Sequence, residues 1–81
     1  MNGSKKAMGV SQIKAFINDP KLDIFKAGDA KQGYYIVMEY YDHEECIFET
    51  HSIYTPRFGD MTLDEWKSEY ESLIKIVKDA N

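Results

Sequence analysis

The residue types with the most chemical potential lie close together, between positions 43 and 51 of the sequence. His43, Cys46 and His51 supply two imidazoles and a thiol, and Glu44 and Glu45 stand beside them. Such groups bind Zn²⁺ when three or four of them converge on one point. Cys46 and His51 are five positions apart, however, so on a regular strand they face opposite sides of the sheet. We therefore expect neither a metal site nor a cysteine nucleophile activated by a histidine.

No other pattern indicates catalysis or a cofactor. The sequence has no phosphate-binding loop, no G-x-G-x-x-G and no H-E-x-x-H motif. With 14 Asp and Glu among 81 residues, a pair of carboxylates is too common to indicate a glycoside hydrolase. A domain of this size also leaves little room for a substrate pocket beside a full core. We predict a protein that is not an enzyme and needs no cofactor.

The composition predicts one folded domain. Hydrophobic residues make up 43% of the chain and aromatic residues 14%, which is too rich for a disordered segment. The single Cys excludes an internal disulfide, and no apolar run approaches the roughly 20 residues of a membrane span. The first residues lack a hydrophobic stretch of signal-peptide length. We expect a cytoplasmic protein without membrane contact, with a flexible head over 1–9 and a single α+β domain over 10–81.

The elements that must position any functional side chain begin with a short helix. Ser11 is a suitable N-cap, and three of the apolar residues that follow it fall on one helix face. Pro20 ends the helix, because proline disfavours the α conformation of the residue before it. The next segment, 21–27, fits a short strand and a helical turn about equally well.

Two strands and a long helix complete the chain. Residues 34–41 and 46–54 are rich in aromatic and β-branched types, and the polar residues 42–45 connect them as a hairpin. Thr62 and Glu65 form a capping box at the start of a C-terminal helix with a continuous apolar stripe. The order predicts an α+β fold, in which a three-stranded antiparallel sheet packs against a short N-terminal helix and a long amphipathic C-terminal helix.

Alternation along the strands separates two faces of this sheet. Unpaired carboxylates are seldom buried, so we assign the residue sets that contain Glu39 and Glu49 to the solvent-exposed face. The apolar residues of that outer face are then Tyr35, Val37, Tyr41, Ile47 and Ile53. Such a mixture fits a protein-binding surface, unless the N-terminal helix covers this face instead.

Charge is segregated along the sequence. Residues 1–31 hold six Lys and three Asp, whereas residues 32–74 hold ten acidic residues and two basic ones. Like charges held together repel, so a concentrated acidic hairpin favours a basic partner that is attracted over a long range. An acidic turn that keeps an edge strand soluble is the simpler explanation. Five of the acids fall within eleven residues: Glu39, Asp42, Glu44, Glu45 and Glu49.

The element order is similar to that of two nucleic-acid-binding families. A helix, three strands and a helix resemble double-stranded-RNA-binding domains, and three strands with a helix resemble integrase arm-binding domains. The first family presents a basic cluster at the start of its last helix, whereas residues 62–67 here are acidic. The second reads DNA with its sheet, where this chain carries Glu39 and Glu49. The charge disfavours nucleic-acid binding in both comparisons, so we transfer no residue roles.

The sequence predicts a small acidic regulator or inhibitor that binds a protein with a basic surface. That partner is a nucleic-acid-binding protein if the carboxylates mimic phosphates, and a phage or mobile element could encode such an inhibitor. Two alternatives remain: a homodimer formed through the outer sheet face, and weak nucleic-acid binding through the N-terminal lysines. The residues predicted to contact the partner are Tyr35, Glu39, Tyr41, Asp42, Glu44, Glu45 and Glu49.

Overall fold

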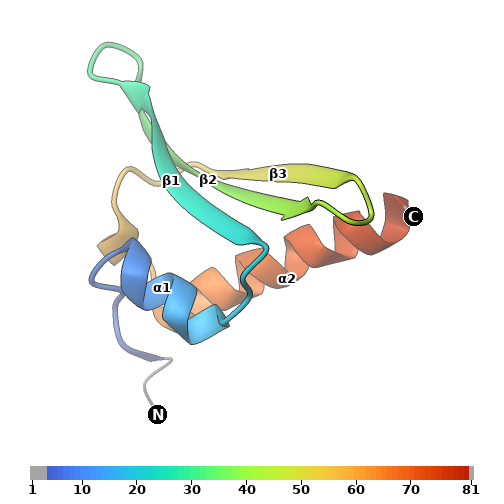
Figure 1. Cartoon of the computed structure of the whole chain (residues 1–81). Helices are drawn as coiled ribbons and strands as arrows, with labels where there is room; N and C mark the ends of the chain where they lie inside the picture. The colour runs from blue at the N-terminus through green and yellow to red at the C-terminus, as the bar shows by residue number, and fades with distance from the viewer. Residues whose placement is uncertain (1–3, 81) are drawn as a thin grey trace.

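The computed structural model, which describes residues 4–80, has the predicted α+β architecture (Figure 1). One helix precedes three antiparallel strands, and a longer helix follows them. No helix within this part of the chain is long and apolar enough to cross a membrane. The elements are α1 (Val10–Ile17), β1 (Leu22–Asp29), β2 (Gly33–Asp42), β3 (Ile47–Ile53), the 3₁₀ turn η2 (Phe58–Asp60) and α2 (Leu63–Ala80).

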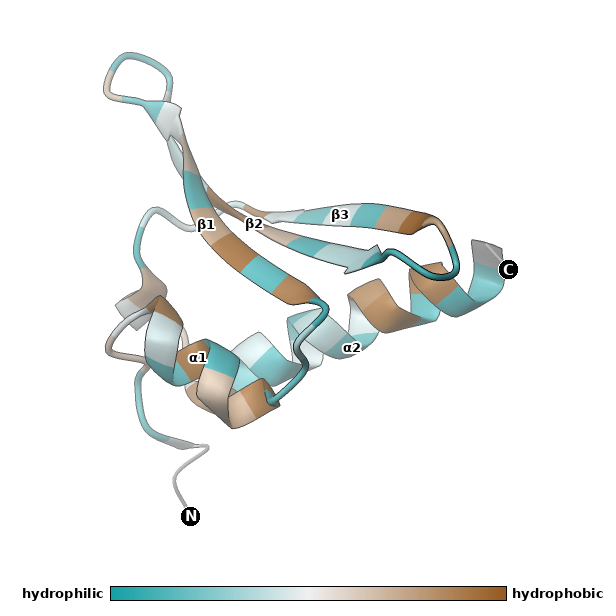
Figure 2. Cartoon of the chain, in the orientation of Figure 1, coloured by the Kyte–Doolittle hydropathy of each residue, from teal (hydrophilic) through white to brown (hydrophobic). Residues whose placement is uncertain are grey.

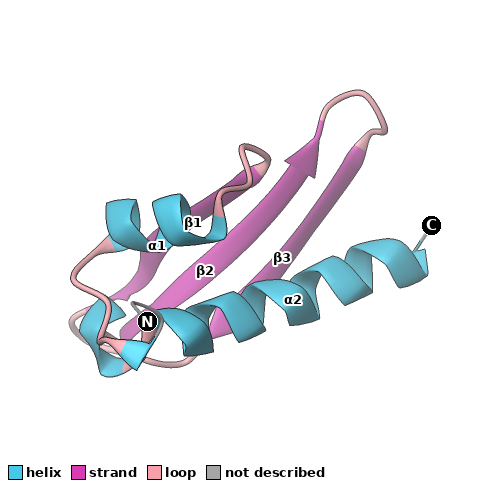
Figure 3. Cartoon of the chain, turned by 90° about the horizontal axis from the view of Figure 1, so that it is seen from below, coloured by secondary structure: helices cyan, strands magenta, loops and turns pink. Residues whose placement is uncertain are grey.

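The sheet has the order β1-β2-β3, so β2 is its central strand. The segment 21–27, for which the sequence left strand and helical turn open, lies mostly in β1. Both helices pack on the same face of the sheet, and Figures 1 and 3 show no described element over the opposite face. The N-terminal helix therefore does not cover the outer face, because its buried Ile13 belongs to the same core as Trp66 of α2.

The core lies between the sheet and the helices. Trp66 is fully buried, and its indole Nε1–H donates a hydrogen bond to the carbonyl of Phe58 at 2.9 Å. Buried aromatic N–H groups need such a partner, so this bond also fixes the loop before α2. Hydrophobic positions recur along the strands and along α2 (Figure 2). The other core residues include Ile13, Leu22, Ile24, Ile36, Met38, Ile53, Leu63 and Leu73.

Helix α2 begins with the capping box that the sequence predicts. The Thr62 backbone N–H donates to Glu65 Oε1 at 2.8 Å, and the Glu65 N–H donates to Thr62 Oγ1 at 3.2 Å. These two bonds satisfy N–H groups that have no partner inside the helix. The hydrogen bond from Thr62 also lowers the pKa of the Glu65 carboxyl, since it favours the ionised form.

Helix α1 begins two residues earlier than predicted. Its N-cap is Gly9, which makes no side-chain cap bond, so the prediction of Ser11 as N-cap was wrong. Gln12 in the first turn accepts a hydrogen bond at its Oε1 from the Met8 N–H at 2.7 Å, which ties the helix to the residue before its N-cap. The predicted end of the helix is confirmed, since Asn18 adopts the left-handed conformation (φ 60°) that terminates helices.

The predicted flexible head is partly integrated into the fold. Residues 1–3 lie outside the described residues. Further along, the Ala7 N–H donates to the Met61 carbonyl and the Leu63 N–H donates to the Lys5 carbonyl, both at 3.0 Å. Lys6 and Thr62 form an isolated antiparallel bridge, and Ala7 is buried in the core. This pairing ties the start of the chain to the start of α2.

The predicted faces of β3 were wrong. Four residues separate Asp42 from its partner Ile47, and Cys46 completes the turn in the left-handed conformation (φ 54°). Turn length fixes the register of a hairpin, and a shift of one residue exchanges the two faces of a strand. Glu39 consequently pairs with Thr50, and Ile53 is buried toward the helices. Ile47, Glu49, His51 and Ile53 all lie on the helix side of the sheet.

Candidate protein-binding surface

The sheet surface opposite the helices is called the outer face from here on. Each strand contributes alternate side chains to it, because successive residues of a strand point to opposite sides. Pairing across the sheet places Phe25 beside Val37, Glu39 beside Thr50, and Tyr41 beside Phe48. The outer face consists of Asp23, Phe25, Ala27 and Asp29 from β1, Tyr35, Val37, Glu39 and Tyr41 from β2, and Phe48, Thr50, Ser52 and Tyr54 from β3 and its end.

Aromatic rings dominate this surface. The exposed fractions are 37% for Phe25, 51% for Tyr41, 56% for Phe48 and 85% for Tyr54. Tyr41 and Phe48 meet edge to face with ring centroids 6.3 Å apart, and Tyr35 and Tyr54 meet at 5.7 Å. The rings thus form two pairs at opposite ends of the sheet. Exposed apolar side chains gathered on one face are typical of an interaction surface.

The charge of the outer face has one sign. Asp23, Asp29 and Glu39 lie on it, and none of its strand residues, all of which the structure describes, is Lys or Arg. Asp23 and Glu39 stand directly opposite each other on neighbouring strands. A like-charge pair in this position is unfavourable. Lys14 of α1 reaches Asp23 at 3.2 Å and offsets part of the repulsion.

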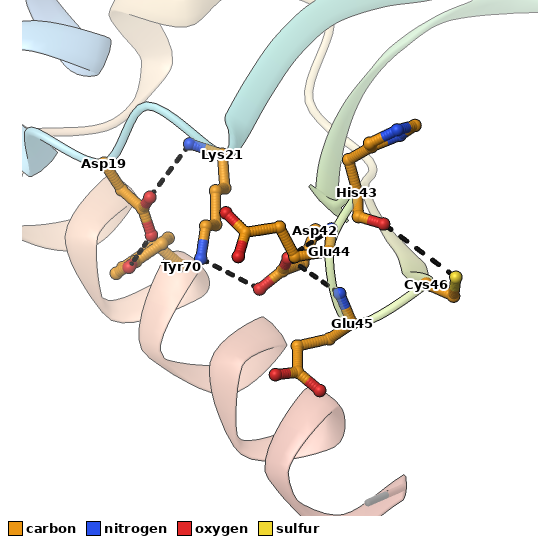
Figure 4. Close-up of polar contacts among 8 residues, drawn as sticks. All are labelled: Asp19, Lys21, Asp42, His43, Glu44, Glu45, Cys46 and Tyr70. Atoms are coloured by element: carbon orange, nitrogen blue, oxygen red, sulfur yellow. Dashed lines mark hydrogen bonds and ion pairs between the residues drawn. The ribbon is translucent and has the colours of Figure 1, made fainter.

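Asp42 has a structural role in the hairpin. Its Oδ1 accepts hydrogen bonds from the Glu44 and Glu45 backbone N–H groups, both at 3.1 Å, and its Oδ2 pairs with Lys21 Nζ at 2.8 Å (Figure 4). The hydrogen bond from Lys21, helped by those from the turn, lowers the pKa of the buried Asp42 carboxyl. Asp42 in turn raises the pKa of the Lys21 ammonium. Asp42 therefore holds the turn in shape and is not presented to a partner.

The predicted contact residues divide into three groups. Tyr35, Glu39 and Tyr41 lie together on the outer face, as the sequence indicated. Glu44 and Glu45 are exposed in the turn at one end of the sheet. The remaining two are directed elsewhere: Asp42 is buried, and Glu49 lies on the helix side. The five clustered acids of the sequence therefore do not form one surface.

Sequence reasoning missed three aromatic residues of the outer face. Phe25 lies in the segment whose structure the sequence left open, and Phe48 and Tyr54 were assigned to the opposite face of β3. Only the hairpin register brings Phe48 beside Tyr41. The four residues of the turn were the signal in the sequence that could have identified this register.

The fold separates His51 from His43 and Cys46, which lie together in the hairpin turn. His51 Nε2 lies 2.7 Å from Glu69 Oε1 of α2, and His43 Nδ1 lies 2.9 Å from the Tyr41 hydroxyl. Cys46 is exposed, with its Sγ 3.8 Å from the His43 carbonyl. Within residues 4–80, no three His, Cys, Asp or Glu side chains are placed to hold a metal ion.

Comparison of the chain with protein-family models, with curated proteins and with solved structures finds no match.

Proposed function

We propose that this protein is a non-enzymatic module that binds another protein through its outer face. The observation that carries the proposal is an uncovered sheet face with exposed aromatic rings, three carboxylates and no basic strand residue. Tyrosine and phenylalanine bury large areas at low entropic cost, which is why aromatic residues supply much of the binding energy at interfaces. The partner is expected to present apolar side chains surrounded by lysine or arginine.

Long-range attraction adds to this contact. The chain carries a net charge of −4, and Glu44 and Glu45 extend the negative surface beyond the outer face at the hairpin turn. A negative surface accelerates association with a positive one, and salt weakens that effect. The proposed roles therefore differ: Tyr41 and Phe48 hold the complex together, whereas Glu44 and Glu45 mainly increase the rate at which it forms.

A basic partner is favoured over a second copy of the chain. Two outer faces in contact would bring Asp23, Asp29 and Glu39 of each copy against the same acids of the other, without a strand lysine or arginine to pair with them. Like charges across an interface are costly. A homodimer is thus the competing outcome, and sedimentation of the protein at several concentrations distinguishes it.

The proposed biological role is regulation by occupation of a basic surface. Proteins that bind nucleic acids carry such surfaces, because they must neutralise phosphates. A small acidic module bound there competes with the nucleic acid for the same lysines and arginines. This part of the proposal rests on the charge of the outer face and of the hairpin turn.

The test is affinity capture from lysate of the source cell at low and high salt, with charge-reversal variants alongside. Glu39→Lys and Tyr41→Ala each change the outer face, and Glu71→Lys, on an exposed position of α2, is the matched control for charge. We expect a specific protein to be captured by the unmodified chain and by Glu71→Lys, but not by either outer-face variant. Capture that survives both outer-face changes contradicts the proposal.

A further inference from the structure

We infer that the outer face selects arginine rather than lysine side chains of its partner, with Glu39 receiving the guanidinium and the Tyr41–Phe48 ring pair lying against it. The inference rests on the proposed function and specifies the partner chemistry at the same surface. It is carried by the position of one carboxylate and two rings on neighbouring strands.

Glu39 is the acid of the outer face that remains without a partner. It lies on the central strand and is half-buried, yet its carboxylate makes no hydrogen bond or ion pair with any residue in the described range, 4–80. The other two acids are engaged. Lys14 pairs with Asp23, and Asp29 Oδ1 accepts hydrogen bonds from the Lys31 and Gln32 backbone N–H groups at 3.0 and 2.7 Å. A cation from outside is therefore attracted most strongly to Glu39.

The neighbours of Glu39 define the space around such a cation. Tyr41 follows two residues later on the same face, about 6.8 Å away along the strand. Phe48 pairs with Tyr41 on β3 and is therefore the diagonal neighbour of Glu39, and the Tyr41 hydroxyl contacts His43 Nδ1 at 2.9 Å on the side of the hairpin turn. The two rings are 51% and 56% exposed, so a partner side chain can reach both. Thr50 stands across from Glu39 on β3 and contributes a hydroxyl. Carboxylate and rings are thus within reach of one long side chain.

This combination suits a guanidinium better than an ammonium. A guanidinium is planar, so it can donate two parallel hydrogen bonds to one carboxylate while a flat face lies on an aromatic ring. The ammonium of lysine is a compact and strongly hydrated charge, which gains less from a ring beside it. A lysine ammonium can pair with the Glu39 carboxylate but gains little from the rings, whereas an arginine guanidinium can contact the carboxylate and the ring pair at the same time.

The experiment is a nuclear magnetic resonance titration of the whole protein with peptides of equal length made only of arginine, only of lysine or only of glutamate. We expect the arginine peptide to shift the amide signals of β2 and β3 around Glu39 and Tyr41. Its dissociation constant should be about fivefold to tenfold lower than that of the lysine peptide, and the glutamate peptide should not bind. The difference between arginine and lysine is the quantity that tests the inference.

Two pairs of variants assign the selectivity to the residues. Tyr41→Phe keeps the ring and should keep the preference for arginine, whereas Tyr41→Leu should abolish the preference. Glu39→Gln should weaken binding of both cationic peptides. Glu71→Gln removes the same charge from an exposed position of α2, away from the ring pair, and should leave the arginine preference unchanged.

The outcomes separate the inference from the proposed function. Equal affinity for the arginine and lysine peptides, with the same signals shifted, overturns the inference and leaves a basic partner for the outer face in place. Signals that shift only on α1 and α2 overturn the inference and contradict the proposed surface as well. No binding of the arginine peptide at low salt overturns the inference, and the capture experiment then decides the proposed function by itself.

Discussion

At the scale of single residues, Asp42 shows how a residue that resembles a binding residue in sequence can be a structural one. It lies in the middle of the acidic run, but its carboxylate is directed into the hairpin, where it orders the turn and binds Lys21. The exposed acids Glu44 and Glu45 depend on Asp42 for their position, because their own backbone N–H groups are its hydrogen-bond donors. A loss of Asp42 therefore affects shape before it affects charge.

Asp42 gives a prediction for stability and its pH dependence. Asp42→Asn keeps an acceptor for the N–H groups of the turn but loses the ion pair with Lys21, whereas Asp42→Ala loses both. The midpoint of thermal unfolding should therefore be lower for Asp42→Asn than for the natural chain, and lowest for Asp42→Ala. The folded pKa of Asp42 is below its usual value of 3.8. Its stabilising effect is therefore complete above that value and is lost as the pH falls through the folded pKa. Thermal unfolding followed by circular dichroism over acidic pH should show a larger loss in the natural chain than in Asp42→Ala, in which Glu65 still contributes.

Tyr70 gives a prediction in the opposite pH range. Burial, together with a hydrogen bond from its hydroxyl to Asp19, raises its pKa well above the ordinary value of 10.0. A raised pKa contributes stability that is present below the unfolded pKa and is lost at higher pH. In an alkaline titration followed by tyrosinate absorbance, one of the six tyrosines should stay protonated until the protein unfolds. The late ionisation of that tyrosine should be missing in Tyr70→Phe. A titration curve of the natural chain in which all six tyrosines ionise in their ordinary range contradicts the assignment to Tyr70.

At the scale of elements, α2 could be predicted from the sequence and the faces of β3 could not. The start of α2 is encoded locally, by Thr62, Glu65 and an apolar stripe within one stretch of chain, so nothing distant was needed. The face of each β3 residue depends on the turn that precedes it. Assigning Glu49 to solvent by its charge therefore misplaced the whole strand, and with it the Phe48 ring of the candidate site.

The capping box of α2 can be measured directly. Thr62→Ala removes the acceptor for the Glu65 N–H and should lower the free energy of unfolding by about 1 kcal/mol, the usual cost of losing such a cap. Thr62→Ser keeps the hydroxyl and should stay close to the natural chain. Urea unfolding of the three proteins gives the comparison, and equal values for Thr62→Ala and Thr62→Ser would contradict the role of the box.

The register of β3 can be tested by two substitutions on opposite faces. Ile53 is buried against the helices, so Ile53→Ala should lower the free energy of unfolding by about 2–4 kcal/mol, as in other aliphatic cores. Phe48 is exposed on the outer face, so Phe48→Ala should cost less than about 1 kcal/mol. Urea unfolding measures both. A larger loss for Phe48→Ala than for Ile53→Ala would indicate the other register.

At the scale of the whole molecule, the protein has two layers with different tasks. The helices α1 and α2 close one side of the sheet, and the core between them and the strands supplies the stability (Figure 3). The other side carries the aromatic rings and Glu39, which lie outside the core between sheet and helices and pack only on neighbouring side chains of the outer face and the hairpin turn. Substitutions on the outer face are therefore expected to alter binding with little change in folding, which is the condition that the capture and titration experiments need.

The pairing of Lys5–Ala7 with Met61–Leu63 also has a consequence for synthesis. The ribosome makes the strands well before α2, which brings Trp66 and Leu73 to the core. Until α2 has left the exit tunnel, only α1 can cover the helix side of the nascent sheet, and Lys5–Ala7 lack their partners. The core is therefore complete only after α2 has been made, and until then the outer face and much of the helix side are open to chaperones.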